Sequence, residues 1–194
     1  MIEFKLTEEN LMLEQSVREW STAEVAPQIR QLDREHRFDE SILKKMAGLG
    51  LLGLCVPKKY GGVGMDYVSL GLASEELEYV DTSLRVILSV HLGLNCLSLL
   101  TWGNEDQKLR YLLPQAKGEK IATYGLTEPG AGSDVRGIQT VAQKKGSRYL
   151  MTGEKMWISH TKSKCMFRTQ YFRSILPDNS RQNSRLQPRR NSVA

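Results

Sequence analysis

The hydrophobic pattern changes near Ile121, and this change constrains the fold more than any other feature of the sequence. Before it, apolar residues recur with the period of an amphipathic helix, as Leu13, Val17 and Trp20 do. After it, short apolar runs alternate with turn residues, which is typical of β-strands. Helices followed by strands predict an α+β fold, with an N-terminal all-α helical bundle and strands after it.

Capping residues predict where the helices begin. Thr7, Asp39, Asp66, Asp81 and Asn104 each precede a segment of helical period, and short polar side chains of this kind accept hydrogen bonds from the first free N–H groups of a helix. We expect Pro27 to kink or end the first helix. The helices expected after these caps are 8–26, 40–46, 67–79, 82–101 and 105–113.

The fourth of these helices contains the most apolar run of the chain, from Leu84 to Leu100. Because it is apolar nearly all round, we expect it to be buried on several sides. Arg85, His91 and Asn95 interrupt the run, which favours a core helix over a membrane span. The apolar positions that carry this expectation are Val86, Ile87, Val90, Leu94 and Leu97.

The strands expected after the helices are short. They are 121–126, 137–142, 148–152 and 156–158, each bounded by turn residues.

Residues 124–134 form a stretch rich in glycine and proline between the first two expected strands. Gly130 and Gly132 permit dihedral angles closed to other residues, so the stretch predicts an open loop with free backbone N–H groups. The hydroxyls of Thr127 and Ser133 lie beside them. Such a loop can hold a phosphate or a flat heterocycle, and the alternative is an ordinary turn.

Composition is that of a soluble globular protein, with 40% hydrophobic and 25% charged residues among 194. The formal charge of +5 is uneven: residues 160–194 hold eight basic residues and one acid, which leaves 19 basic and 21 acidic residues before them. A solvated tail is the expected state of 160–194, and a nucleic-acid or anionic-surface patch is the alternative. Three cysteines without C-x-x-C spacing and three scattered histidines predict neither a disulfide framework nor a metal site.

Two motifs, Tyr-Gly-Leu-Thr-Glu-Pro-Gly-Ala-Gly-Ser-Asp at 124–134 and Gly-Glu-Lys-Met-Trp-Ile-Ser at 153–159, resemble those of the acyl-CoA dehydrogenase family of flavoproteins. The resemblance covers residues from about 3 to 159. It implies a helical N-terminal domain at 1–120 and, at 121–159, part of a β-barrel-like middle domain with flavin-binding motifs. Residues 160–194 do not resemble the family, so we expect a C-terminally truncated member.

The resemblance implies that FAD is the cofactor. Leu126 and Thr127 would donate to the polar edge of the flavin, Trp157 would pack against its face, and Ser159 would lie near its N5 atom. Ser133 would contact both the pyrophosphate and the CoA substrate. The cofactor-binding residues implied in this way are Tyr124, Gly125, Leu126, Thr127, Glu128, Pro129, Gly130, Ala131, Gly132, Ser133, Trp157, Ile158 and Ser159.

The implied reaction is the α,β-dehydrogenation of an acyl-CoA thioester, in which a glutamate removes the α-proton and hydride passes to FAD N5. In the family this base comes from a helical region that follows the β domain, so we assign no catalytic residue in this chain. Glu128, inside a Pro-Gly turn, is interpreted as a turn or salt-bridge residue. The alternatives are a non-catalytic truncated or alternatively encoded product, and a small interaction protein that uses its basic tail.

The resemblance further implies an acyl-CoA substrate, an electron-transfer flavoprotein as partner, and homo-oligomers, in fatty acid or amino acid catabolism. We expect no nucleic-acid partner, no membrane span and no metal. The N-terminus shows no targeting peptide. We therefore expect a cytoplasmic protein, or a mitochondrial matrix protein lacking its targeting segment if the source is eukaryotic.

Overall fold

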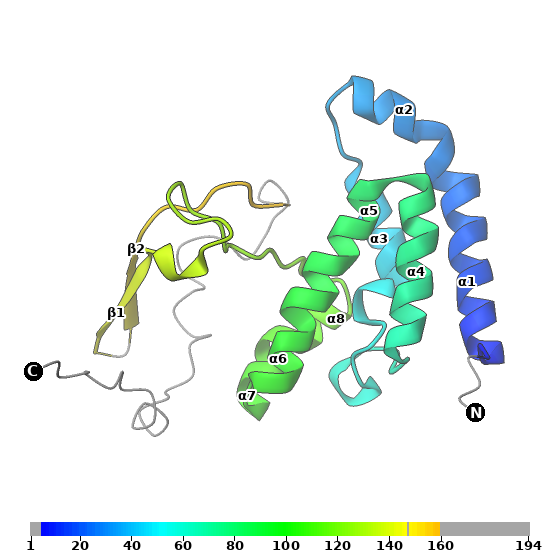
Figure 1. Ribbon diagram of the computed structural model, residues 1–194. Helices are drawn as coiled ribbons and strands as arrows, with labels where there is room; N and C mark the ends of the chain where they lie inside the picture. Colours follow the sequence, from blue (N-terminus) through cyan, green and yellow to red (C-terminus); the bar gives the residue numbers. More distant parts are fainter. Residues whose placement is uncertain (1–4, 147, 160–194) are drawn as a thin grey trace, which may run out of the picture.

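The computed structural model describes residues 5–146 and 148–159. A helical bundle lies on one side and a β-hairpin on the other, joined by an extended segment (Figure 1). This arrangement confirms the predicted α+β fold. The main elements are α1 (Glu8–Trp20), α2 (Ala26–Arg34), α3 (Glu40–Gly48), α4 (Tyr67–Val80), α5 (Thr82–Leu88), α6 (Leu97–Trp102), α7 (Glu105–Gln107), α8 (Leu113–Ala116), β1 (Val141–Lys145) and β2 (Arg148–Thr152).

All five predicted N-caps are confirmed. Thr7 accepts a hydrogen bond from the N–H of Asn10 at 3.1 Å, and Asn104 accepts one from Gln107 at 2.9 Å. Each of these pairs also forms the reciprocal bond of a capping box. The aspartates Asp39, Asp66 and Asp81 cap α3, α4 and α5 by accepting hydrogen bonds from backbone N–H groups of the first turn.

Pro27 does not end the first helix. One π-helical segment, η1 (Ser21–Val25), follows α1, and Pro27 then occupies the first turn of α2, where a missing N–H costs no hydrogen bond. The chain therefore stays helical but changes direction, and α2 leans away from the axis of α1 (Figure 1). Pro114 is accommodated in the same way in the first turn of α8, after the π-helical segment η5 (Lys108–Leu112).

The hydrophobic core belongs to the helical bundle. Its largest fully buried side chains come from α3, the segment after it, η5, and the helix that runs from Thr82 to Trp102 through α5, the π-helical segment η4 (Ser89–Cys96) and α6. They include Met46, Leu51, Leu52, Leu84, Ile87, Leu88, Leu92 and Leu112.

The helix from Thr82 to Trp102 is buried on one face rather than on several. Leu94 is 44% exposed and Trp102 is 80% exposed, while Val86, Val90 and Leu97 are half-buried. By length and composition this helix is apolar enough to cross a membrane, the one such helix among the described residues. Its other face nevertheless packs into the core through Leu84, Ile87, Leu88 and Leu92.

The β part is smaller than predicted. β2 has the expected bounds, whereas the strand expected at 137–142 begins only at Val141. A 3-10 turn, Val135–Gly137, occupies its start, and the N–H groups of Gln139 and Thr140 donate to the carboxylate of Glu128 instead of to a strand. β1 and β2 pair antiparallel, with Val141 opposite Thr152. The strands expected at 121–126 and 156–158 are absent, because neither segment has a strand partner among the described residues and a strand requires one.

Candidate functional site

The two sequence motifs meet at the end of the hairpin. The ammonium group of Lys155 donates to the carbonyl oxygen of Leu126 at 2.9 Å and to the carboxylate of Glu128 at 2.8 Å. The N–H of Met156 donates to the carbonyl oxygen of Thr127 at 3.0 Å. Residues 126–128 of the first motif therefore lie directly beside residues 155–156 of the second.

The carboxylate of Glu128 joins the two motifs through hydrogen bonds. Its carboxylate is buried, with the residue 6% exposed, and accepts hydrogen bonds from the N–H groups of Gln139 at 2.7 Å and Thr140 at 3.0 Å besides that from Lys155. The hydrogen bond from Lys155 is the largest cause, and those from Thr140 and Gln139 add to it, in lowering the pKa of Glu128 to about 2. A carboxylate with so low a pKa is a poor proton acceptor at neutral pH. The structure agrees with the interpretation of Glu128 as a turn and salt-bridge residue.

The loop around Glu128 is less open than predicted. The N–H and carbonyl groups of Glu128 and Ala131 pair with each other at 3.0 and 3.1 Å, and so close a tight turn over Pro129 and Gly130. Their N–H groups cannot donate to a ligand. The N–H groups of Leu126 and Thr127, by contrast, have no hydrogen-bond partner among the described residues. These two donors remain available beside the turn.

Gly130 and Gly132 are not needed for unusual dihedral angles, contrary to expectation. Neither has a positive φ, and a Cβ added at either would meet nothing within 4 Å. Their effect is to leave the backbone bare on an open surface, which permits close approach by a ligand.

Gly153, at the start of the second motif, has a stronger requirement. Its φ is +157°, and a Cβ there would lie 2.2 Å from the hydroxyl oxygen of Thr140. Only glycine lets the chain leave β2 against Thr140 and reach Glu128 with Lys155.

Trp157 follows in a conformation that is rare for a bulky residue. Its φ is +59° and its side chain is 84% exposed. Large aromatic side chains are normally at least partly buried, and a left-handed backbone costs such a residue about 1–3 kcal/mol. Trp157 directly follows Met156, whose N–H binds Thr127, so the exposed indole and the free N–H donors of Leu126 and Thr127 belong to adjoining segments. Groups of these kinds can hold a flat heterocycle that carries acceptors along one edge.

The remaining predicted site residues differ in how far they are exposed to solvent. Tyr124 and Leu126 are 43% and 39% exposed, and Ser133 is exposed. Ala131 is buried, so its side chain shapes the loop rather than offering a contact. The half-buried or exposed members of the predicted set also include Gly125, Thr127, Pro129, Ile158 and Ser159.

Sequence reasoning missed the residues that support the site. Lys155 stood within the second motif, but its ion pair with Glu128 spans 27 positions and leaves no local pattern. Gln139 and Thr140 contribute through backbone N–H groups, which no side-chain pattern can reveal. His91 stands out in the sequence only as a polar residue that interrupts the apolar run from Leu84 to Leu100.

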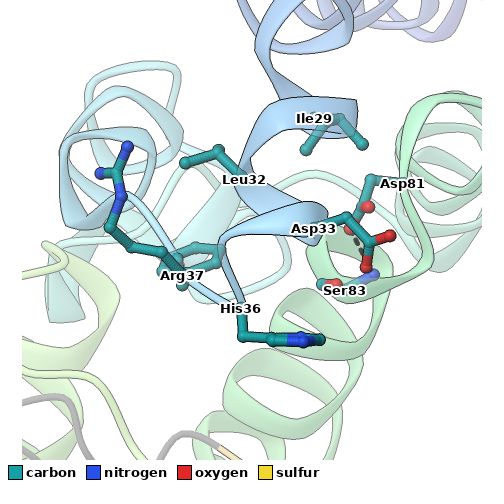
Figure 2. Close-up of a pocket in the computed structure, with 8 residues that line it drawn as sticks. Ile29, Leu32, Asp33, His36, Arg37, Asp81 and Ser83 are labelled. Carbon is teal, nitrogen blue, oxygen red and sulfur yellow. Dashed lines mark hydrogen bonds between the residues drawn. The ribbon is translucent and has the colours of Figure 1, made fainter.

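A hollow of about 240 Å³ lies elsewhere, between the end of α2 and the start of α5. Figure 2 shows His36, Arg37 and Asp33 at its rim. Asp81 also lines it, but its carboxylate already caps α5 by accepting from the N–H of Ser83 at 2.7 Å. None of the predicted site residues lines this hollow. Within 5–146 and 148–159 no group of three metal-ligating side chains occurs, and the predicted basic tail at 160–194 lies outside the described residues.

Comparison with known proteins matches both parts of the chain to one family. The family model described as acyl-CoA dehydrogenase, N-terminal domain, matches residues 7–119, and the one described as acyl-CoA dehydrogenase, middle domain, matches residues 123–183. The second match runs past Ser159, where we placed the end of the resemblance, into residues that the structure does not describe.

Individual proteins agree with the family models. The chain is 44% identical over 160 residues to the short-chain specific acyl-CoA dehydrogenase of Clostridium acetobutylicum, covering 82% of this chain and 42% of that protein. A chain in the solved structure of the electron transferring flavoprotein of Acidaminococcus fermentans is 37% identical, with a TM-score of 0.81, over 84% of this chain and 43% of that one. A glutaryl-CoA dehydrogenase from Mycobacterium smegmatis, solved in complex with FADH2, is 33% identical with a TM-score of 0.75, over 79% of this chain and 39% of that one.

The chain thus spans about two fifths of the length of these relatives. The N-terminal domain model alone covers more than half of the chain, and the middle-domain model includes both motifs that meet at Glu128 and Lys155. The chain belongs to the acyl-CoA dehydrogenase family.

Proposed function

We propose that this protein is a flavin-dependent acyl-CoA dehydrogenase and that the described residues supply the part of its site that holds the flavin ring. The observation that carries the proposal is the junction of the two motifs, which places free N–H donors on Leu126 and Thr127 beside a chain that presents an exposed Trp157. FAD fits this junction, because the flavin is flat and carries acceptors along one edge. When bound, FAD accepts the hydride that leaves the β-carbon of the acyl-CoA.

Each residue has a distinct part in this proposal. The N–H groups of Leu126 and Thr127 would donate to the edge of the ring where negative charge develops, and fixed donors of this kind stabilise the transition state. Trp157 would cover one face of the ring and exclude water, and Ser159 would offer a hydroxyl near the reacting atoms. Ser133, which is exposed, would contact the pyrophosphate and the CoA. The bare backbone at Gly130 and Gly132 leaves room for both.

Neither carboxylate of the first motif serves as the base that removes the α-proton, and the family resemblance assigns that base to a helical region after the β domain. Glu128 is committed to Lys155 and two N–H groups, and Asp134 caps a 3-10 turn by accepting from the N–H of Arg136 at 3.0 Å. We therefore expect the 194-residue chain, supplied with FAD, to turn over no saturated acyl-CoA. Dye reduction above the rate of a flavin-only control would contradict this.

Flavin binding can be tested through a matched pair of tryptophans. Trp157 and Trp102 are 84% and 80% exposed, but only Trp157 lies at the junction of the motifs. We expect the chain to quench flavin fluorescence reversibly, and Trp157→Ala to weaken this affinity about tenfold, as removal of an aromatic stacking partner does. Trp102→Ala should leave it unchanged. Equal effects of the two substitutions, or no quenching by the wild-type chain, would refute the proposed site.

We expect the binding to be weak. The described residues include proposed contacts for the flavin ring and the pyrophosphate, but none for the adenine end of FAD. FAD should therefore separate from the chain during gel filtration. A flavin spectrum at one FAD per chain after that step would contradict this expectation.

The proposal extends to partners and compartment. We propose an acyl-CoA thioester as substrate, an electron-transfer flavoprotein as electron acceptor, and assembly into homo-oligomers, by analogy with the family. We also propose a reducing compartment, either the cytoplasm or the mitochondrial matrix. Cys55 and Cys96 are free thiols within the described part of the chain, which supports this proposal.

A further inference from the structure

A fully buried histidine connects the helical bundle to the segment that carries the first motif. His91 lies in the π-helical segment η4 and is 0% exposed. Its Nδ1 atom lies 3.0 Å from the backbone nitrogen of Ala122, and its Nε2 atom lies 3.1 Å from the carbonyl oxygen of Gln115. One imidazole ring therefore joins η4, α8 and the segment that leads out of the bundle.

These partners determine the protonation of the ring. The backbone N–H of Ala122 can only donate, so Nδ1 carries no proton. The carbonyl oxygen of Gln115 can only accept, so Nε2 carries one. His91 is thus a neutral imidazole of defined tautomer, with a separate task at each nitrogen.

The bond to Ala122 replaces the strand pairing that the sequence predicted for this segment. Ile121, Ala122 and Thr123 are buried, yet residues 121–125 make no other backbone hydrogen bond within the described part of the chain. A buried N–H group without a partner is costly. The imidazole therefore fixes the point at which the chain leaves the bundle, four residues before Leu126.

We infer that His91 is a positioning residue for the flavin-ring site, acting through Ala122 on the N–H donors of Leu126 and Thr127. This inference rests on the proposed function. The bond from Nε2 to Gln115 stabilises only the bundle, because both of its ends lie there. The two bonds should therefore have separable effects on stability and on flavin affinity.

Two substitutions separate them. In His91→Asn the side-chain oxygen takes the place of Nδ1 and can accept from Ala122, whereas in His91→Gln the amide nitrogen takes the place of Nε2 and can donate to Gln115. We expect His91→Asn to retain flavin affinity within about threefold and His91→Gln to lose about tenfold, the value of one buried hydrogen bond. His36→Asn, on an exposed histidine with a φ of +49° that asparagine tolerates, is the control and should change nothing.

A second readout needs no flavin. The amide hydrogen of Ala122 should exchange slowly in the wild-type chain and in His91→Asn, and about tenfold faster in His91→Gln. Imidazole ¹⁵N NMR of the wild-type chain should show a protonated Nε2 and an unprotonated Nδ1, whether or not the variants fold.

A proton on Nδ1, or equal losses of flavin affinity in both variants, would overturn the inference. A wild-type chain that quenches no flavin would overturn the proposed function and the positioning role together, whereas the exchange rates would still show whether His91 anchors Ala122.

Discussion

The helical bundle and the junction of the two motifs are held together by different forces. The contiguous hydrophobic core contains 24 buried residues, and all of them lie between Val17 and Ile121. Beyond Thr123, the buried residues of the described chain are Glu128 and Ala131. The bundle is therefore stabilised by apolar burial, and the junction by a few hydrogen bonds that converge on one carboxylate. A site held by so few contacts can keep its donors and its indole open to a ligand, but it contributes little to global stability.

The largest expected effect contrasts a leucine from each region. Leu88 in α5 is 0% exposed, whereas Leu150 in β2 is 49% exposed. Leu88→Ala should lower the free energy of unfolding by about 2–5 kcal/mol, because it leaves a cavity in the core. Leu150→Ala should change it by less than about 0.5 kcal/mol. Urea unfolding followed by helical circular dichroism measures both, and similar losses would show that the hairpin belongs to the cooperative core.

Limited trypsin digestion should reveal the same contrast as an order of cleavage. Within the described residues we expect the hairpin to be cut first, at Lys145. Lys155 should be cut later, because its side chain is bound to Glu128. A helical fragment ending between Lys117 and Lys120 should survive longest. Mass spectrometry of a time course identifies the cuts, and early cleavage within α1 or α4 would contradict the assignment of the core.

Glu128→Gln should loosen the junction without affecting the bundle. The amide is nearly isosteric but carries no charge, so the ion pair with Lys155 is lost and the hydrogen bonds from Gln139 and Thr140 weaken. We expect several-fold faster amide exchange at Gln139 and Thr140 and earlier tryptic cleavage at Lys155. The urea midpoint of the helical signal should not move. Glu154→Gln, on the exposed neighbour of Lys155, is the matched control.

The smallest effect is a pH dependence confined to the junction. The pKa of Glu128 is lowered to about 2 from a usual value of about 4.3, so its stabilising contribution is complete above the usual value and is lost as the pH falls toward 2. Trp157 emission should therefore stay constant down to about pH 4 and change below it. The difference in emission between the wild-type chain and Trp157→Phe isolates this signal. A change centred near pH 4 to 5 would mean that Lys155 does not hold the carboxylate.

Local sequence determined the helical part of this protein. Thr7, Asp39, Asp66, Asp81 and Asn104 mark helix starts because a cap needs only the first turn that follows it. The bounds of β2 followed in the same way from alternation and flanking turn residues. The residue types of both motifs were likewise visible in the sequence, and so was the family that they resemble.

Tertiary structure decided what those motifs do in space. Residues 121–126 have strand composition but form no strand, because pairing requires a second strand that the described chain does not place beside them. Trp157 takes its positive φ directly after Lys155 and Met156, which bind the first motif 29 residues away. The two tasks of His91 depend on partners 24 and 31 residues away. Contacts over such distances leave no periodic trace in a sequence, because they depend on how separate elements pack against one another.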